Sequence, residues 1–240
     1  MDHNLILLDE ATVYNASHLM GFFSVFNNDA IKDVKLYKGD IPASNGGRLA
    51  SLLDVRMKEG NSKAFAATGG IGTISSRLTI EGPIMSENTT FVASGRRTYA
   101  DLFLPFAPNE SIRDNRLFFY DLNLKINHRV NDNNRFYLSG YSGRDIFKNE
   151  FAKFGFGNQT LTFRWNHLFG PKLFLNSSVV FSSYDYYLGT GNVDANSFVW
   201  NSNMEDYSTK FDFTYFLNSN STLRFGVQST CHVIGAGIAK

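Results

Sequence analysis

The residues of this sequence that could do chemistry are not spaced as a catalytic or metal site requires. No two histidines occur in the patterns HxH or HxxxH, which bring two imidazoles to one metal ion; the five are His3, His18, His128, His167 and His232. Ser17 and His18 are adjacent, whereas a nucleophile and its base usually come from separate places in the chain, and no GxSxG motif occurs. The sequence therefore predicts no enzyme, no metal site and no cofactor.

The charged residues favour structural roles over recognition of an acidic polymer. Asp54, Glu59 and Glu81 flank basic residues, so they are expected to form ion pairs. The net charge is +1 and no face gathers lysine and arginine, which excludes nucleic acid as a partner. A single cysteine, Cys231, excludes an intrachain disulfide and a multi-cysteine metal site.

The clearest structural pattern is an alternating stretch at residues 118–130. Apolar Phe118, Leu122 and Leu124 alternate with a polar set, which consists of Asp121, Asn123, Lys125, Asn127 and Arg129. This period of two predicts a strand with one apolar and one charged face. If the apolar face meets lipid, a cation on that face would cost about 2–4 kcal/mol near the midplane, so the polar set is predicted to face the lumen of a barrel.

Further long alternating runs continue to the end of the chain, at residues 161–169, 173–187, 207–217 and 223–231. Transmembrane strands need about 9–11 residues, whereas soluble strands most often have about 5 or 6. Short connections are expected at 85–87, 131–133, 170–171 and 218–220, and long ones at 101–115, 145–155 and 188–204. That strict alternation is typical of outer-membrane barrels. It also requires a short rising strand at about 63–69, which makes nine predicted strands.

The region before these runs has a different pattern. Residues 5–8 and 11–14 are predicted as short strands joined by a polar turn, and Asn27 to Asp29 as the cap of a short helix that runs through Ile31. Residues 31–61 then predict a strand, a glycine-rich loop and a second strand. The pair Gly46-Gly47 can adopt a positive φ, so the backbone is expected to shape this loop.

The 31–61 stretch resembles the final part of the plug domain of TonB-dependent outer-membrane receptors. The matching positions are Ile31, Val34, Leu36, Lys38, Gly39, Pro42, Ala43, Gly46, Gly47, Asp54, Val55 and Arg56. The variant with Tyr37-Lys38-Gly39 and Gly47-Arg48-Leu49 is similar to the receptors of Bacteroidetes-type bacteria. Asn45 departs from the pattern, because an aromatic residue usually precedes the glycine pair in this family.

The resemblance implies a mostly all-β chain with the C-terminal part of a plug domain at residues 1–62. An incomplete antiparallel transmembrane β-barrel is expected at residues 63–240. No signal peptide follows Met1, so the chain is expected to be a fragment that lacks the early plug. The family implies location in the bacterial outer membrane and active uptake of a large ligand. Its partners would be outer-membrane lipid, TonB through the missing N-terminal part, and a surface lipoprotein as a further candidate.

The family also implies that Arg48 and Arg56 lock the plug to acidic barrel residues, with solvated surface charge as the alternative. Two other classes of protein are kept as alternatives to the receptor. One is a small self-contained outer-membrane barrel with a structural or adhesin role. The other is a soluble carbohydrate-binding sandwich, which strand length and the alternation of connections disfavour.

Overall fold

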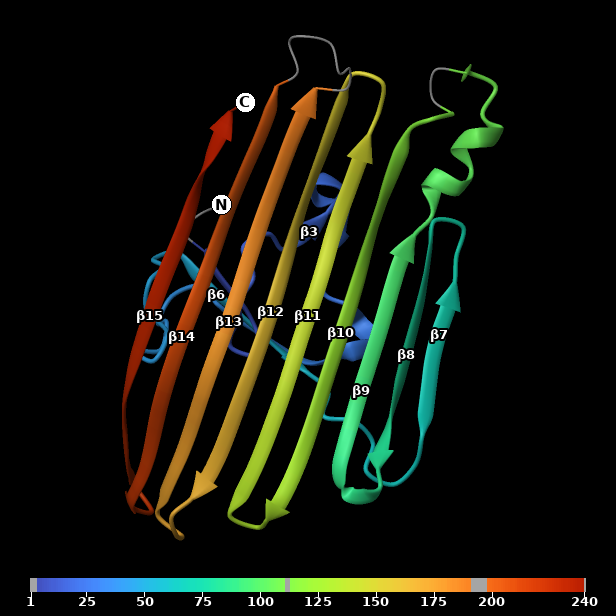
Figure 1. Ribbon diagram of the computed structural model, residues 1–240. Coiled ribbons are helices and arrows are strands. Elements are labelled where there is room, and N and C mark those ends of the chain that lie inside the picture. The colour runs from blue at the N-terminus through green and yellow to red at the C-terminus, as the bar shows by residue number, and fades with distance from the viewer. Residues whose placement is uncertain (1–3, 111–112, 191–197, 240) are drawn as a thin grey trace.

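A computed structural model describes residues 4–110, 113–190 and 198–239. Its largest element is a nine-stranded sheet in which each strand pairs antiparallel with the next along the chain. The strands are β7 (Ala66–Ile71), β8 (Ser75–Ile84), β9 (Ser86–Thr98), β10 (Arg116–Asn131), β11 (Asn134–Lys148), β12 (Ala152–Leu168), β13 (Leu173–Thr190), β14 (Val199–Asn218) and β15 (Ser221–Ala239). The chain therefore has the mostly all-β fold that its alternation predicts (Figure 1).

The strands are longer than the sequence pattern indicates. β10, predicted at 118–130, spans 16 residues, and β14, predicted from 207, spans 20 residues. The predicted riser at 63–69 is β7, which is displaced by two or three residues toward the C-terminus. These extensions arise because cross-strand pairing continues into polar sequence where the alternation is no longer clean.

Connections at one end of the sheet are tight, as expected. β8 and β9 are separated only by Met85, and the later turns are short as well: β10 to β11, β12 to β13 and β14 to β15. At the opposite end, β9 ends at Thr98 and β10 begins at Arg116, so the predicted long connection at 101–115 lies partly outside the described residues. Its described part contains the 3-10 helices η3 (Ala100–Leu102) and η4 (Leu104–Phe106). The prediction of a long connection at 188–204 lies partly outside the described residues, because β13 ends at Thr190 and β14 begins at Val199.

The prediction of a long connection at 145–155 is wrong. β11 continues to Lys148 and β12 begins at Ala152, so only residues 149–151 join them. Phe147 is directly opposite Phe154, and their rings stack with centroids 4.8 Å apart. This aromatic pair extends the ladder through a stretch whose glycines and charges suggest a loop.

The N-terminal segment, defined here as residues 4–62, forms a separate small sheet with strand order β2-β1-β6-β5. Its strands are β1 (Asn4–Leu8), β2 (Ala11–Thr12), β5 (Ile31–Tyr37) and β6 (Ser51–Met57); β3 (Ser17–His18) and β4 (Phe23–Ser24) pair separately. β1 runs parallel to β6, and β5 runs antiparallel to it. The segment also holds the 3-10 helices η1 (Leu19–Gly21) and η2 (Asn28–Ala30). The predicted short helix is thus η2, which ends before Ile31, because Ile31 is the first residue of β5.

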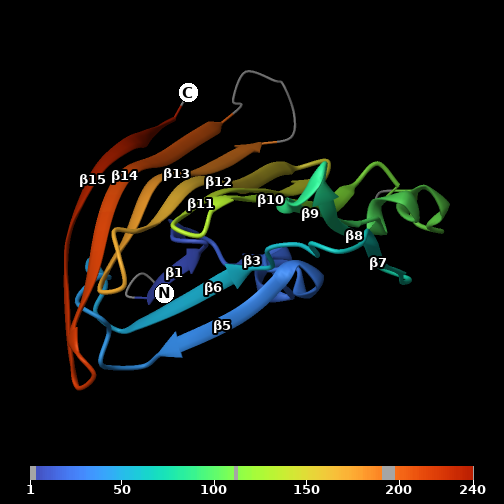
Figure 2. The ribbon, with the colours of Figure 1, turned by 90° about the horizontal axis from the view of Figure 1, so that it is seen from below.

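The N-terminal segment lies on the concave side of the curved nine-stranded sheet (Figure 2). A small apolar core joins the two layers. It contains Leu8, Val13, Val25, Val55 and Met57 from the segment and Tyr141 from β11. The helices in the described ranges are short turns, and none of them is long and apolar enough to cross a bilayer.

Candidate functional site

The concave face of the sheet buries charged and polar side chains under the N-terminal segment. Successive residues of a strand point to opposite faces, so every second residue of β9 to β14 faces the concave side, where this segment lies. The buried polar set on this face includes Ser94, Asp121, Asn123, Lys125, Asp145, Asn158, Thr160, Thr162, Arg164, Ser178 and Asp206. Buried charges are costly unless they are paired, and the partners of this set come largely from residues 9–29.

His18 is held between two carboxylates of the sheet. Its Nε2 lies 2.5 Å from Asp121 Oδ1, and its Nδ1 contacts Asp145 Oδ2. The backbone N–H of Leu19 donates to the other oxygen of Asp145 at 2.7 Å. The imidazole stacks on Phe119 with centroids 4.2 Å apart. Both ring nitrogens face carboxylate oxygens, and this geometry favours the doubly protonated imidazolium, in which both nitrogens donate.

The pKa of His18 is set by two opposing effects. Burial lowers the pKa of the imidazole, but its hydrogen bonds to Asp121 and Asp145 and the negative charges of these two carboxylates outweigh this effect, so the pKa is raised above its ordinary value. A second cation completes the cluster, since Arg96 Nε lies 2.7 Å from Asp121 Oδ2. Tyr141 donates its hydroxyl to Asp121 Oδ1 at 2.9 Å. The two carboxylates are therefore neutralised by two cations inside a closed site.

The turn from β1 to β2 carries the second contact between the layers. Asp9 and Glu10 have φ values of 46° and 77°, so both adopt the left-handed conformation that suits a two-residue hairpin. The Asp9 carboxylate lies 2.9 Å from Lys125 Nζ, which also donates to the carbonyl of Met57 at 3.1 Å. Lys125 is only 2% exposed, so this pair neutralises the lysine away from water.

Glu10 enters the sheet beside Asp9 and has a cation on either side. Its carboxylate lies 3.1 Å from Arg56 of β6 and 3.4 Å from Arg164 of β12, and it also accepts a hydrogen bond from Ser178. Burial would raise the pKa of Glu10, but Arg164 and Arg56 outweigh this effect and lower the pKa to about 2. The carboxylate is thus ionised throughout the physiological range.

Two further contacts extend along the length of the segment. Tyr14 donates its hydroxyl to Asp206 of β14, whose other oxygen lies 2.5 Å from His232 Nδ1. Near the other side of the sheet, Asn27 donates to Ser94 at 2.5 Å. The contacts therefore reach from β9 to β14, so the segment is attached across most of the sheet.

The residues predicted to face a lumen all lie on the concave face of β10. Asp121 and Lys125 make the ion pairs described above, and Asn123 is 5% exposed. Asn127 donates to Thr90 at 3.4 Å, and Arg129 donates to Asn88 at 3.0 Å near the exposed end of the strand. Their burial thus decreases toward the end with the tight turns.

The residues matched to the plug pattern have two different environments. Lys38, Gly39, Gly46, Gly47 and Arg48 are exposed in the connection between β5 and β6. Pro42 lies in the same connection and is half-buried. Of the glycine pair, Gly47 has a positive φ, 93°, and Gly46 does not. Asn45, the departure from the family pattern, accepts a hydrogen bond from Lys210 of β14 at 3.3 Å, which ties this loop to the sheet.

The expectation that Arg56 locks the N-terminal segment to acidic sheet residues is wrong. Its carboxylate partners are Asp54 at 3.1 Å and Glu10 at 3.1 Å, and both belong to the segment itself. Arg48 makes no ion pair within the described ranges. Glu10 makes the connection in the reverse sense, with the acid in the segment and the cation, Arg164, in the sheet.

Sequence reasoning missed the residues that carry these contacts from the segment. His18, Asp9 and Glu10 lie far from their partners; His18 is separated from Asp121 by 103 residues and from Asp145 by 127. The one local signal was the polar turn at Asp9-Glu10 between two apolar runs. No spacing rule joins residues so far apart.

No protein-family model matches the sequence, and no curated protein matches it significantly. Solved structures do match. The copper transporter OprC aligns with 97% of the chain at a TM-score of 0.70 and 11% identity. The ferric preacinetobactin receptor BauA of Acinetobacter baumannii aligns with 97% of the chain at a TM-score of 0.65 and 10% identity. The siderophore receptor PiuA of the same organism aligns with 97% of the chain at a TM-score of 0.59 and 12% identity.

The fold is that of part of a TonB-dependent receptor. The chain spans 38%, 39% and 40% of the lengths of OprC, BauA and PiuA. Matches at 10–12% identity show a shared fold and nothing of the ligand. The ligand named for each of those proteins is therefore a property of that protein.

Proposed function

We propose that this chain forms part of a receptor that takes up a large ligand across the bacterial outer membrane with energy supplied through TonB. Residues 63–240 would be barrel strands and residues 1–62 the C-terminal part of a plug. The observation that carries the proposal is the ion-paired attachment of residues 9–29 to the concave face of an otherwise long-stranded sheet. A transporter of this kind needs a plug that stays in the barrel at rest and can still be displaced.

The convex face supports the membrane part of the proposal. Its middle carries exposed apolar side chains, which include Leu122, Leu124, Leu138, Leu161, Phe163, Val179, Tyr207 and Phe211. Such a face is unfavourable in water but suits hydrocarbon. The tight turns would then lie in the periplasm and residues 99–115 at the cell exterior.

Two finer assignments rest on resemblance. The Tyr37-Lys38-Gly39 and Gly47-Arg48-Leu49 combination favours a receptor of the Bacteroidetes type, and such a receptor would have a surface lipoprotein as a candidate partner. The ligand class stays open, since the similar proteins are a copper transporter and siderophore receptors. Within the described residues β7 and β15 do not pair with each other, which disfavours the alternative of a small closed barrel made from these strands.

A reversible cross-link tests the proposal. In a Cys231→Ser background, Asn27→Cys and Ser94→Cys would place two thiols where the side chains now meet at 2.5 Å. The receptor that contains this chain would be expressed in native cells whose growth depends on its nutrient. We expect the oxidised pair to stop growth and a reductant to restore it, while heat-modifiable gel mobility stays unchanged.

Each single-cysteine variant is the matched control and should grow normally under both conditions. Full uptake with the cross-link formed would contradict the proposal that this segment moves during transport. A receptor absent from the outer membrane would contradict the location.

A further inference from the structure

The concave face of β10 to β14 continues beyond the ion pairs that hold the N-terminal segment. These strands extend past Asp121, Asp145 and Asp206 toward the end of the sheet that carries residues 99–115. The outer wall is defined here as the concave side chains of residues 116–120, 146–148, 152–157, 184–190 and 199–205. Its composition differs from that of the face under the segment.

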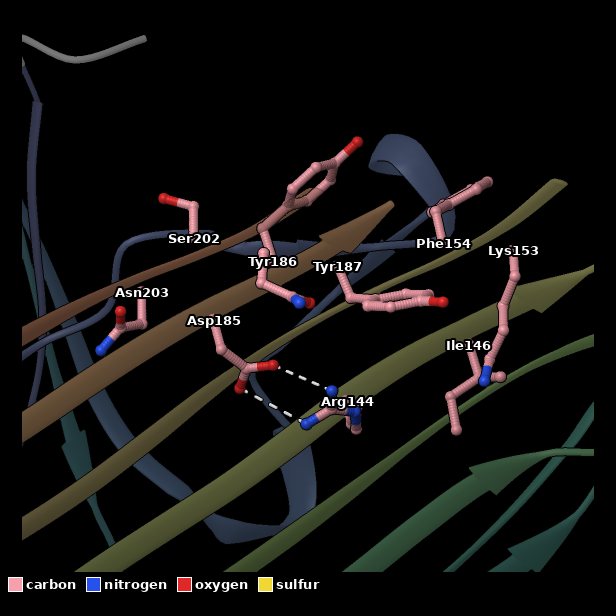
Figure 3. Close-up of a pocket in the computed structure, with 11 residues that line it drawn as sticks. Arg144, Ile146, Lys153, Phe154, Asp185, Tyr186, Tyr187, Ser202 and Asn203 are labelled. Atoms are coloured by element: carbon pink, nitrogen blue, oxygen red, sulfur yellow. Dashed lines mark hydrogen bonds and ion pairs between the residues drawn. The ribbon is translucent and has the colours of Figure 1, made fainter. Parts of the chain in front are cut away.

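Every charged side chain in these ranges points away from the outer wall. Lys148 lies three residues beyond Asp145, and Glu205 lies next to Asp206, so each takes the face opposite to that concave carboxylate. Figure 3 shows Tyr186 and Phe154 on one side of the strands and Asp185 and Arg144 on the other. The charged residues of the ranges, all convex, are Arg116, Lys148, Lys153, Asp185 and Glu205. The wall therefore offers a ligand no charged group.

Aromatic and aliphatic side chains form a continuous row across the outer wall. The rings of Phe147 and Phe154 stack with centroids 4.8 Å apart. Leu188 is directly opposite Phe154, and Trp200 is directly opposite Leu188. Trp200 is 40% exposed, and a side chain at Gly237 of β15 would collide with its indole, so part of the ring rests on backbone and part meets solvent. The row thus presents an apolar ring surface on the concave side.

Tyrosine hydroxyls lie beside this apolar row. Tyr186 is two residues from Leu188 on the same face of β13, and Tyr184 is two residues further. The Tyr184 ring centroid lies 6.3 Å from that of Tyr14, so the wall adjoins the N-terminal segment here. Both tyrosines are half-buried, and neither hydroxyl bonds to another described residue. The two hydroxyls are therefore available to a ligand.

The missing charges point to an uncharged ligand. An ion that leaves water for an aromatic wall loses its hydration and finds no counter-ion there. The faces of aromatic rings also carry partial negative charge, so they repel anions. A purely apolar ligand fits badly for another reason, since it would cover the hydroxyls of Tyr184 and Tyr186 without bonding to them. The wall suits a molecule that has both an apolar face and hydroxyl groups.

A saccharide without acidic or basic groups has both features. Each ring has an apolar face, which packs on aromatic side chains, and a rim of hydroxyls, which bond to polar groups. The wall also has the extent of an oligomer, because four strand spacings, about 19 Å, separate β10 from β14. A single sugar ring would cover only a small part of it.

We propose that the outer wall binds a neutral oligosaccharide, with sugar rings on Phe154 and Trp200 and hydroxyls bonded to Tyr184 and Tyr186. The inference rests on the proposed function and names the substrate class of that receptor. The same wall would exclude carboxylated, sulfated and cationic ligands.

The test uses the receptor that contains this chain, purified in detergent and applied to a printed array of oligosaccharides. The array holds neutral oligomers of glucose, mannose, galactose and xylose, carboxylated galacturonate oligomers, sulfated galactose oligomers and cationic glucosamine oligomers. A ferric catecholate complex is a separate probe in solution. We expect binding to neutral oligomers alone. Titration calorimetry with the neutral oligomer that binds best then gives its Kd for wild type and variants.

Tyr186→Ala and Trp200→Ala should each raise this Kd by about tenfold or more, because each removes aromatic surface that the sugar covers. Tyr186→Phe keeps the ring and should raise the Kd by a smaller factor. Tyr187→Ala is the matched control, since Tyr187 follows Tyr186 but lies on the convex face, and it should leave the Kd unchanged.

A charge placed on the wall gives a second readout. Ser202→Lys on the concave face should weaken binding of the neutral oligomer and introduce binding of galacturonate oligomers, whereas Asn203→Lys on the convex face should do neither.

Three results would overturn the inference: binding of a charged probe in place of neutral oligomers, no binding to any neutral oligomer, or equal Kd values for Tyr186→Ala and Tyr187→Ala. Each of them leaves the proposed function intact where cells still take up another nutrient through the receptor. A neutral oligosaccharide that binds the wall and is not taken up would overturn the proposed function instead.

Discussion

The two faces of the nine-stranded sheet carry opposite chemistry on the same strands. Within β10, Asp121 is fully buried on the concave face, whereas its neighbour Leu122 is 56% exposed on the convex face. A soluble protein has the reverse arrangement, with leucine inside and aspartate in water. The difference teaches that the N-terminal segment buries the polar side chains of the concave face, whereas the convex face leaves apolar side chains uncovered. Each face can therefore be tested by a substitution that the other face would tolerate.

The largest effect is expected from His18→Ala on the concave side. Removing the imidazolium leaves Asp121 and Asp145 buried with less positive charge, and losing one partner of a buried pair costs about 3–5 kcal/mol. Hydrogen exchange and protease cleavage within residues 4–62 should increase. His167→Ala on the convex side, where His167 contacts Asn134 and neighbouring rings, is the control and should change neither.

The same site gives a pH dependence of known sign. Because the pKa of His18 is raised in the folded protein, its stabilisation is complete below the ordinary value of 6.5 and is lost as pH rises through the raised value. In wild type, protection of residues 4–62 from hydrogen exchange should therefore decrease as the pH rises through the raised pKa of His18. An equal fall in His18→Ala would show that another group is responsible.

On the convex side, Leu161→Arg should cost about 2–4 kcal/mol of stability in a bilayer, because the charge would enter hydrocarbon. Gln159→Arg is the matched control: it lies two residues away on the same face of β12 and replaces a polar side chain, so it should cost less than Leu161→Arg. Urea unfolding in lipid vesicles measures both. A cost for Leu161→Arg that is no larger than the cost for Gln159→Arg would contradict the placement of Leu161 in hydrocarbon.

Glu10→Gln tests the concave face again with a smaller effect. It removes one negative charge between Arg56 and Arg164, and an unsatisfied buried group costs about 1–3 kcal/mol. Glu59→Gln, whose partners Lys32 and Arg135 are more exposed, should cost less. Since the pKa of Glu10 is about 2, its contribution is present above 4.5 and is lost as pH falls toward 2. Exchange protection of residues 4–62 that is the same in Glu10→Gln and wild type would rule this contact out.

The smallest effect is expected in the loop between β5 and β6. Gly47→Val should destabilise the loop by about 1–2 kcal/mol, because a side chain is disfavoured at a φ of 93°. Gly46→Val should be tolerated, since Gly46 has no positive φ and a Cβ there meets nothing within 4 Å. Hydrogen exchange of the backbone amides from Lys38 to Ala50 distinguishes the two variants. If both behave alike, backbone conformation does not shape this loop.

The features of the fold that depend on residues close together in the chain can be predicted from the sequence. Alternation at 118–130 is enough to place Asp121 and Lys125 on one face and Leu122 on the other, and the nine strands follow from similar runs. It does not predict the His18 site, because Asp145 falls in a stretch expected to be a loop. The pairing of β11 with β12 continues past Asp145 to Lys148, which lies opposite Lys153, and this extension brings Asp145 under the segment. Contacts between distant residues depend on register, which local pattern does not contain.

The parallel pairing of β1 with β6 determines the order in which this chain can assemble. Leu5 is opposite Leu52, so the small sheet closes only after about fifty residues have reached the same compartment. His18 must wait for Asp145, and Tyr14 for Asp206, before either can bind. Contacts at such sequence separation form slowly because loop closure precedes them. His18 and Tyr14 of the N-terminal segment therefore stay without these partners until β11 and β14 are in place.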